Sequence, residues 1–211
     1  MKLASAIYGA AHPFDKFGLF SKVITARIPA DLDGADALVV WGGADIHPSL
    51  YNDVNTHSGV GTAPSPRDNM EWELMKQAVH NKIPIIGICR GGQMLCALAG
   101  GKLYQHVDNH AGGGHGVVTR AEESFIVSSL HHQMMNPAGT KHELVAWSTH
   151  NRSPKYYDAR GTHDKTSTEV EPEYIYFPEI RGHAIQWHPE FHRADEECNL
   201  WLKEHWRKHG L

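Results

Sequence analysis

Apolar and polar residues in the first half of the chain follow a pattern that predicts strands alternating with helices. Short apolar runs at 2–8, 22–26, 35–41 and 83–88 have the length of strands, and residues 14–20 form a short helical or irregular piece between the first two. A helix is predicted over 68–81, where Met70, Leu74 and Ala78 fall on one stripe. Because strands and helices alternate, this half predicts a parallel sheet covered by helices.

The second half predicts shorter strands and a final helix. The strands fall at 117–120, 125–128, 144–148, 174–177 and 183–187, and the last two are expected to pair. The helix is predicted over 194–209, with Cys198, Trp201 and Leu202 on one face. Residues 149–172 are polar and rich in turn formers, which indicates a mobile surface excursion. Without a repeat or a second compositional region, residues 1–211 are expected to form one α/β domain.

A cysteine stands where the apolar run 83–88 ends and a helix-compatible segment, 94–99, follows. Cys89 is flanked by Gly87 and Gly91, so the pattern is strand, sharp turn and helix with a partly exposed thiol at the turn. The positive end of the following helix favours the thiolate, which is the form that attacks carbonyl carbons. A buried cysteine in an ordinary strand-to-helix turn is the simpler alternative, but the flanking glycines favour a nucleophile.

Charge and composition exclude several classes of protein. The net charge of −4 over 211 residues leaves no basic face for nucleic acid. No apolar run approaches the roughly 18 residues of a membrane span, and residues 1–19 lack a signal-peptide core. Three cysteines, Cys89, Cys96 and Cys198, give an odd count without paired spacing. A reduced, cytoplasmic protein is the expected setting.

Seventeen histidines raise the question of a metal site. The densest stretch contains His106, His110 and His115, but no helical His-Glu-x-x-His motif or cysteine pair accompanies it. The glycines at 112–114 provide no preformed geometry. The sequence therefore favours a solvated loop, and no metal or other cofactor is expected.

A partner for the cysteine occurs near the C-terminus in the segment His188-Pro189-Glu190. In extended backbone His188 and Glu190 point to the same side, so the carboxylate can hold one ring nitrogen while the other faces a thiol. A strand-end turn with a surface salt bridge is an equally simple interpretation of this segment alone.

The two motifs in this order resemble the class I glutamine amidotransferase superfamily, most closely its γ-glutamyl hydrolase branch, which includes γ-glutamyl-γ-aminobutyrate hydrolase. Further segments match the pattern of that branch across most of the chain. They are Gly42-Gly43-Ala44-Asp45 with Pro48 and Tyr51, Arg67-Asp68 with Glu71, Gly100-Gly101-Lys102-Leu103-Tyr104-Gln105, His115, and Ser129-Leu130-His131-His132-Gln133. The resemblance implies a three-layer α/β fold with a mostly parallel central sheet, flanking helices and a nucleophile elbow.

The resemblance also assigns roles to residues. It implies that Cys89 is the nucleophile, His188 the acid/base and Glu190 its orienting partner. The oxyanion hole would use the backbone N–H groups of Arg90 and of Gly43, with Gly42 as second choice. Glycine suits this role because it lets a main-chain donor approach a developing oxyanion closely.

The substrate-binding residues implied by the resemblance are Arg90, His131, Gln93, Glu71 and Asp45. A fixed guanidinium at Arg90 could grip a substrate carboxylate. His131 is alternatively a loop histidine bonded to backbone, and Glu71 a local i,i+4 partner of Arg67. The departures from the pattern lie at 109–114, before Tyr174 and in the N-terminal region, so the leaving group stays open.

The sequence thus favours a cytoplasmic cysteine hydrolase that cleaves a γ-glutamyl amide or isopeptide bond through a γ-glutamyl thioester and releases glutamate. One alternative is a glutaminase subunit that passes ammonia to a separate synthetase, although such subunits usually carry an apolar or aromatic residue where Arg90 stands. Another is a catalytically silent binding module on the same fold. The expected partner is a small γ-glutamyl substrate, with no nucleic acid or membrane, and a homodimer is compatible with the sequence.

Overall fold

A nine-stranded sheet forms the centre of the molecule. The structure is a computed structural model and describes residues 1–6, 18–163 and 170–211. Seven of the nine strands run in one direction, and β13 and β7 run in the other. The strands in spatial order are β2 (Lys22–Ala26), β1 (Lys2–Ala6), β3 (Ala37–Val40), β4 (Ile85–Ile88), β14 (Gly182–Ile185), β13 (Pro172–Phe177), β10 (Glu143–Ser148), β7 (Gly114–Thr119) and β8 (Ser124–Ser128). The predicted mostly parallel sheet is confirmed.

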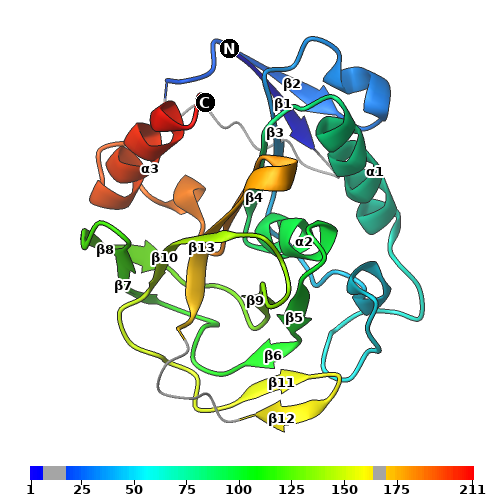
Figure 1. Ribbon diagram of the computed structural model, residues 1–211, viewed down its shortest axis with the longest axis vertical. Helices are drawn as coiled ribbons and strands as arrows, with labels where there is room; N and C mark the ends of the chain where they lie inside the picture. Colours follow the sequence, from blue (N-terminus) through cyan, green and yellow to red (C-terminus); the bar gives the residue numbers. More distant parts are fainter. Residues whose placement is uncertain (7–17, 164–169) are drawn as a thin grey trace.

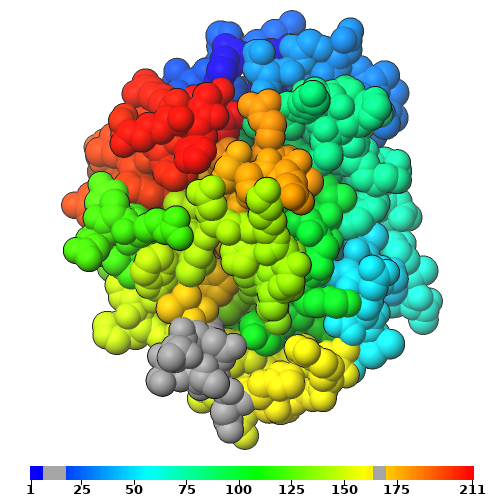
Figure 2. All heavy atoms as spheres, viewed as in Figure 1, coloured from blue at the N-terminus to red at the C-terminus, as the bar shows by residue number. Residues whose placement is uncertain are grey.

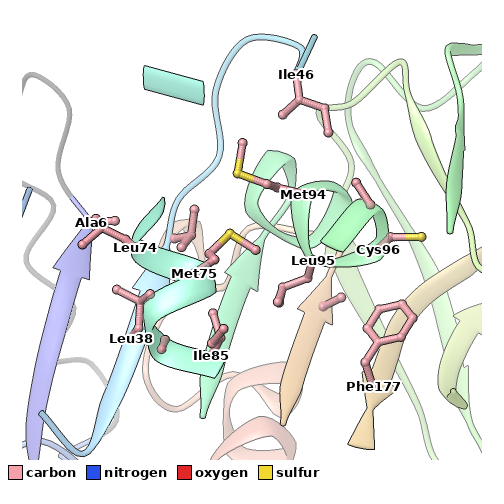
Figure 3. Close-up of a cluster of buried hydrophobic side chains, with 14 of the residues drawn as sticks. Ala6, Leu38, Ile46, Leu74, Met75, Ile85, Met94, Leu95, Cys96 and Phe177 are labelled. Carbon is pink, nitrogen blue, oxygen red and sulfur yellow. The ribbon is translucent and has the colours of Figure 1, made fainter. Parts of the chain in front are cut away.

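Helices cover both faces of this sheet (Figure 1). Helices α1 (Pro66–His80) and α2 (Arg90–Leu98) pack on one face, where Leu38 and Ile85 contact a cluster that includes Leu74 and Leu95 (Figure 3). Helix α3 (Glu197–Lys208) covers the other face, where the cluster contains the alternate strand residues Val39 and Ile86 together with Leu202 and Trp206. Neighbouring strand residues point to opposite faces, so these apolar strands require a helical layer on each side. The three-layer α/β fold is therefore confirmed.

The start of α1 shows how the sequence sets an element boundary. The Ser65 hydroxyl accepts a hydrogen bond from the Asp68 N–H (3.0 Å), and the Asp68 carboxylate accepts one from the Ser65 N–H (2.9 Å). This reciprocal cap, with Pro66 at the first helical position, begins the helix two residues before the predicted start. The other predicted elements agree with the structure within a few residues, and α3 begins three residues later than predicted.

The polar segment 149–172 is more ordered than its sequence indicates. Strands β11 (Tyr156–Asp158) and β12 (Gly161–His163) form a hairpin that pairs with β6 (His106–Val107) at one end of the molecule (Figures 1 and 2). The Asp158 carboxylate accepts hydrogen bonds from Arg160 and His163, and the Tyr156 ring is buried. The expectation of a mobile excursion is wrong for this part, because its polar side chains satisfy one another.

Smaller elements complete the described chain. Strands β5 (Lys102–Tyr104) and β9 (Met134–Asn136) form a second pair, and short 3-10 helices occur at η1 (Pro29–Leu32), η2 (Pro48–Tyr51), η3 (Pro178–Ile180) and η4 (Pro189–Phe191). The end of the predicted strand 2–8 and most of the piece predicted over 14–20 lie outside the described residues. Within the described residues, every helix is too short or too polar to cross a lipid bilayer.

Candidate active site

Cys89 occupies a strained turn between β4 and α2. Its backbone has φ 48° and ψ −105°, a conformation that non-glycine residues rarely adopt and that is maintained by the surrounding structure. A Cβ on Gly91 would lie 2.1 Å from the carbonyl oxygen of Val40, so only glycine lets the helix start this close to β3. The turn brings the thiol to the carboxyl edge of the sheet at the N-terminus of α2. The cysteine is 4 % exposed, less than the sequence predicts for a turn residue.

His188 and Glu190 lie beside this turn because β14 pairs with β4 in parallel. Ile185 pairs with Ile88, so the residues that follow both strands leave the sheet at the same edge. The imidazole of His188 hydrogen-bonds the Cys89 thiol, and its Nδ1 lies 2.7 Å from Oε1 of Glu190. The ring of Phe191 stacks on the imidazole with a centroid distance of 4.7 Å. The structure thus brings together the three side chains to which the sequence assigns catalysis.

The charge state of His188 follows from these contacts. Burial of the imidazole acts to lower its pKa, but the hydrogen bonds to Cys89 and Glu190 outweigh this effect and raise the pKa to about 10. An imidazolium at neutral pH can stabilise a thiolate and can later donate a proton to a leaving group.

The loop that follows β3 lies against the same imidazole. A Cβ on Gly42 would be 2.4 Å from Cε1 of His188, so the ring can occupy its position only beside glycine. The guanidinium of Arg67 donates to the carbonyl oxygens of Trp41 (3.1 Å) and Gly42 (3.0 Å), which fixes this loop. The N–H of Arg90 lies in the first turn of α2, where helix donors have no intrahelical partner. The oxyanion role of Gly43, Gly42 and Arg90 stays a prediction.

Buried charges join α1 to the cysteine turn. The Arg90 guanidinium is 2 % exposed and donates to Asp68 (2.5 Å) and to Glu71. The other oxygen of Glu71 accepts from Nε of Arg67 at 2.8 Å, so both parts of this carboxylate are used. Substrate contact by Arg90 and Glu71 stays a prediction, but the geometry favours a positioning role, because their charged groups already neutralise each other.

The two adjacent histidines at 131 and 132 have different surroundings. His131 is buried, with Nδ1 2.9 Å from the carbonyl oxygen of Gln133, and burial together with nearby His110 lowers its pKa well below the usual value. His132 is partly exposed and lies 2.9 Å from Asp45, whose carboxylate raises the pKa of the imidazole. Gln93 donates to the carbonyl oxygen of Gln133 (3.0 Å), which holds this segment against α2. The backbone contact that the sequence left as an alternative for His131 is present.

A cavity of about 210 Å³ opens beside the loop after β3. Its lining includes Ala44, Asp45, Arg67 and Arg90. Charged and small residues on this side of the site leave room for a polar group next to the cysteine turn.

Sequence reasoning missed a buried group of histidines and carboxylates. His110 and His115 are 0 % and 9 % exposed, and they pair with Glu171 at 3.0 Å and Glu173 at 2.8 Å. The prediction of a solvated loop is therefore wrong at His110 and His115, although His106 is partly exposed. The one signal in the sequence was that Glu171 and Glu173 stand beside the apolar strand residues in 171–177. The polar composition of the segment does not reveal that these glutamates are buried.

Comparison with protein families and curated proteins gives a consistent result. Residues 23–120 match the family described as Peptidase C26. A glutamine amidotransferase-like protein YvdE homolog of Lactococcus lactis subsp. cremoris is 32 % identical over 135 residues, which cover 54 % of this chain and 71 % of that protein. A Mycobacterium tuberculosis protein, provisionally named a glutamine amidotransferase, is 35 % identical over 127 residues, covering 51 % of this chain and 41 % of that protein. The chain thus spans less than half the length of this longer relative.

Solved structures share the fold at low sequence identity. A glutamine amidotransferase from Thermotoga maritima aligns over 90 % of this chain and 76 % of its own, with a TM-score of 0.56 and 15 % identity. A protein of Thermoplasma acidophilum, provisionally described as a component of GMP synthase, aligns over 100 % of this chain and 97 % of its own, with a TM-score of 0.53 and 16 % identity. At this identity the likeness shows the fold alone.

Proposed function

Since this chain belongs to the Peptidase C26 family of class I glutamine amidotransferase-like proteins, we propose that it is a cysteine hydrolase of γ-glutamyl amide bonds. The observation that carries the proposal is the hydrogen-bonded row of Cys89, His188 and Glu190 at the strained turn. Family membership alone supports a hydrolase or an amidotransferase. The γ-glutamyl specificity goes beyond what family membership supports and is part of the proposal.

The first half of the reaction would form a thioester. The Cys89 thiolate attacks the γ-carbonyl carbon, and the N–H groups of Arg90 and Gly43 receive the negative charge of the tetrahedral oxyanion. The imidazolium of His188 then donates its proton to the leaving amine, and the C–N bond breaks. Glu190 keeps the ring oriented with its proton toward the reacting atoms.

The second half would release glutamate. His188, now neutral, takes a proton from water, and the resulting hydroxide attacks the thioester carbonyl. Collapse of the second tetrahedral intermediate breaks the C–S bond and restores the thiolate and the imidazolium. The same imidazole acts first as acid and then as base. Its contact with the Cys89 sulfur raises its pKa, and this contribution is lost while the sulfur is part of the thioester and returns when the C–S bond breaks.

The leaving-group side favours an amine larger than ammonia. The proposal assigns the leaving group to the cavity lined by Ala44, Asp45 and Arg90, where the carboxylate of Asp45, the partner of His132, is a polar group of the lining. The rival function is ammonia supply to a synthetase, with which the shared fold is equally compatible. The two functions differ in whether the chain acts alone and in which amide it prefers.

The test is a screen of the purified chain for glutamate release from glutamine and a panel of γ-glutamyl amines. The proposal predicts turnover without a partner, with kcat/KM for at least one amine about tenfold above that for glutamine, which is roughly 1.4 kcal/mol of transition-state binding. Glutamine as best substrate, or activity only after a second protein is added, would support the ammonia-supplying function. The absence of turnover with every member of the panel would support a silent binding module.

A further inference from the structure

A second cluster of potential ligand groups lies within the fold, formed by His110, His115 and Glu173. The residues come from the loop before β7, from β7 and from β13, and they are 0 %, 9 % and 0 % exposed. Each offers one nitrogen or oxygen atom, and these atoms all lie within 4.8 Å of one another. Residues that are distant in sequence thus present donor atoms to one small buried volume.

The hydrogen bonds around His110 leave one of its nitrogens available. Its Nε2 lies 3.0 Å from Glu171, a carboxylate that also accepts from the N–H groups of Arg152 (2.8 Å) and Ser153 (2.9 Å). The Nε2 therefore carries the proton in the neutral ring, and Nδ1 carries the lone pair. The Ser129 Oγ lies 3.4 Å from this Nδ1 and 2.9 Å from the carbonyl oxygen of His110, and its single proton is better directed to the nearer carbonyl oxygen. A carboxylate behind a histidine is the usual support of a metal-binding imidazole.

Two further atoms of the cluster have no hydrogen-bond partner among the described residues. They are Nδ1 of His115 and Oε2 of Glu173, and both are buried. Buried polar atoms of this kind normally have a partner, because leaving one unsatisfied costs about 1–3 kcal/mol. They are a second observation, independent of the clustering, that indicates a ligand.

The two carboxylates at the cluster have no lysine or arginine partner. Glu171 and Glu173 are both fully buried, and among the described residues their ion-pair partners are histidines rather than lysines or arginines. Buried carboxylates in proteins are normally paired with a cation or coordinate a metal ion.

We propose that His110, His115 and Glu173 bind one divalent transition-metal ion, with Zn²⁺ as the best fit. Two imidazoles and a carboxylate form a donor set typical of zinc, whereas Ca²⁺ and Mg²⁺ prefer oxygen alone. Tetrahedral ligands about 2.0–2.2 Å from zinc lie roughly 3.3 Å apart, and the donor atoms of the cluster, all within 4.8 Å of one another, would move to that spacing on binding. The ion would tie the loop before β7 to β13. It would also support His131, whose ring lies 4.7 Å from that of His110.

The first experiment measures metal binding by the full chain in a Cys89→Ser background, which removes the catalytic thiol as a competing ligand. Chelator-treated protein is titrated with Zn²⁺ and, separately, with Co²⁺, whose visible absorption reports tetrahedral coordination. We expect one ion per chain, a tetrahedral Co²⁺ spectrum that Zn²⁺ abolishes, and a rise in Tm on binding. No stoichiometric binding, no spectrum and an unchanged Tm would overturn the proposal.

The second experiment locates the ion with matched variants. Glu173→Gln keeps the shape of a ligand but removes its charge, and it should weaken Zn²⁺ binding by more than about 100-fold, while Glu171→Gln, one step further out, should weaken it by about 10–100-fold. Glu196→Gln is the control. Glu196 pairs with His192 at 2.7 Å near the surface and belongs to a separate group of potential ligands, which His192, Glu196 and Cys198 form. Loss of binding in the control with retention in Glu173→Gln would place the ion elsewhere and contradict the proposal. Circular dichroism verifies that each variant is folded, and a variant that is unfolded is replaced by His115→Gln.

Discussion

At the scale of single residues, the pair of His188 and Glu190 connects structure to pH dependence. The raised pKa of about 10 depends on hydrogen bonds to Cys89 and Glu190 that outweigh the opposing effect of burial. Replacing Glu190 by glutamine removes one of the two charges that favour the imidazolium. The pKa should then fall, so the imidazolium would be lost at a lower pH than in the wild type.

We therefore predict that Glu190→Gln moves the basic limb of the kcat/KM profile to lower pH and reduces kcat less than His188→Asn does. The measurement is a pH profile of glutamate release for both variants. Glu196→Gln, at the equivalent pair with His192, is the control and should leave the profile unchanged. A basic limb that stays in place in Glu190→Gln would show that Glu190 does not tune His188.

Gly42 gives a second prediction at this scale. An added methyl group would occupy the space of the His188 ring, because its carbon would be 2.4 Å from Cε1. Gly42→Ala should lower kcat by about 100-fold or more, since a shift of about 1 Å in a catalytic group costs that much. Gly112→Ala is the control, because nothing lies within 4 Å of its added carbon. Equal rates for the two variants would contradict this geometry.

At the scale of elements, α1 positions the cysteine turn through buried charge. Glu71→Gln would leave Arg90 with Asp68 as its remaining anionic partner and would weaken the contact of Arg67. Breaking one partner of a buried pair costs about 3–5 kcal/mol, so the free energy of unfolding should fall by that order. Glu73→Gln, on the same helix in an exposed pair with Lys76, should change it by less than about 0.5 kcal/mol.

Urea unfolding of both variants provides this comparison. If Arg90 instead binds the substrate directly, Glu71→Gln would raise KM for γ-glutamyl substrates while stability changed little. That result would return Arg90 to the substrate-binding role that the sequence suggested.

The elements also show what the sequence could and could not predict. The strands and helices around Cys89 were predictable because their apolar runs have clear lengths and because the elbow glycines are a local signal. The cap at Ser65 is a local signal too, but the predicted start at residue 68 missed it. The hairpin at 156–163 and the burial of His110 were not. Their polar side chains are satisfied by partners distant in sequence, such as Glu171, and composition alone indicates a solvated segment there.

At the scale of the whole molecule, buried neutral histidines link stability to pH. Burial lowers the pKa of His183 well below its usual value and that of His205 to about 4. Between pH about 6.5 and 4 the unfolded chain therefore binds more protons than the folded chain, and stability falls as the pH is lowered. The stabilising contribution of these neutral histidines is fully present above about pH 6.5.

We predict that Tm falls as the pH is lowered from 7 to 5, and that the fall is smaller in His205→Gln, which cannot be protonated. Differential scanning calorimetry across this range measures both chains. His142→Gln, at an exposed histidine, is the control and should follow the wild type. Parallel Tm curves for His205→Gln and the wild type would exclude this origin of acid sensitivity.

The central claim is that Cys89 carries the γ-glutamyl group during turnover, and mass spectrometry of acid-quenched protein tests it directly. The other two thiols, Cys96 and Cys198, are buried, and burial raises their pKa values to about 12 and 11, so they are poor nucleophiles. Incubation with γ-glutamyl p-nitroanilide followed by quenching should yield one γ-glutamyl group on the peptide that contains Cys89, and none in Cys89→Ala. A γ-glutamyl group on Cys96 or Cys198, or glutamate release by Cys89→Ala at the wild-type rate, would contradict the account.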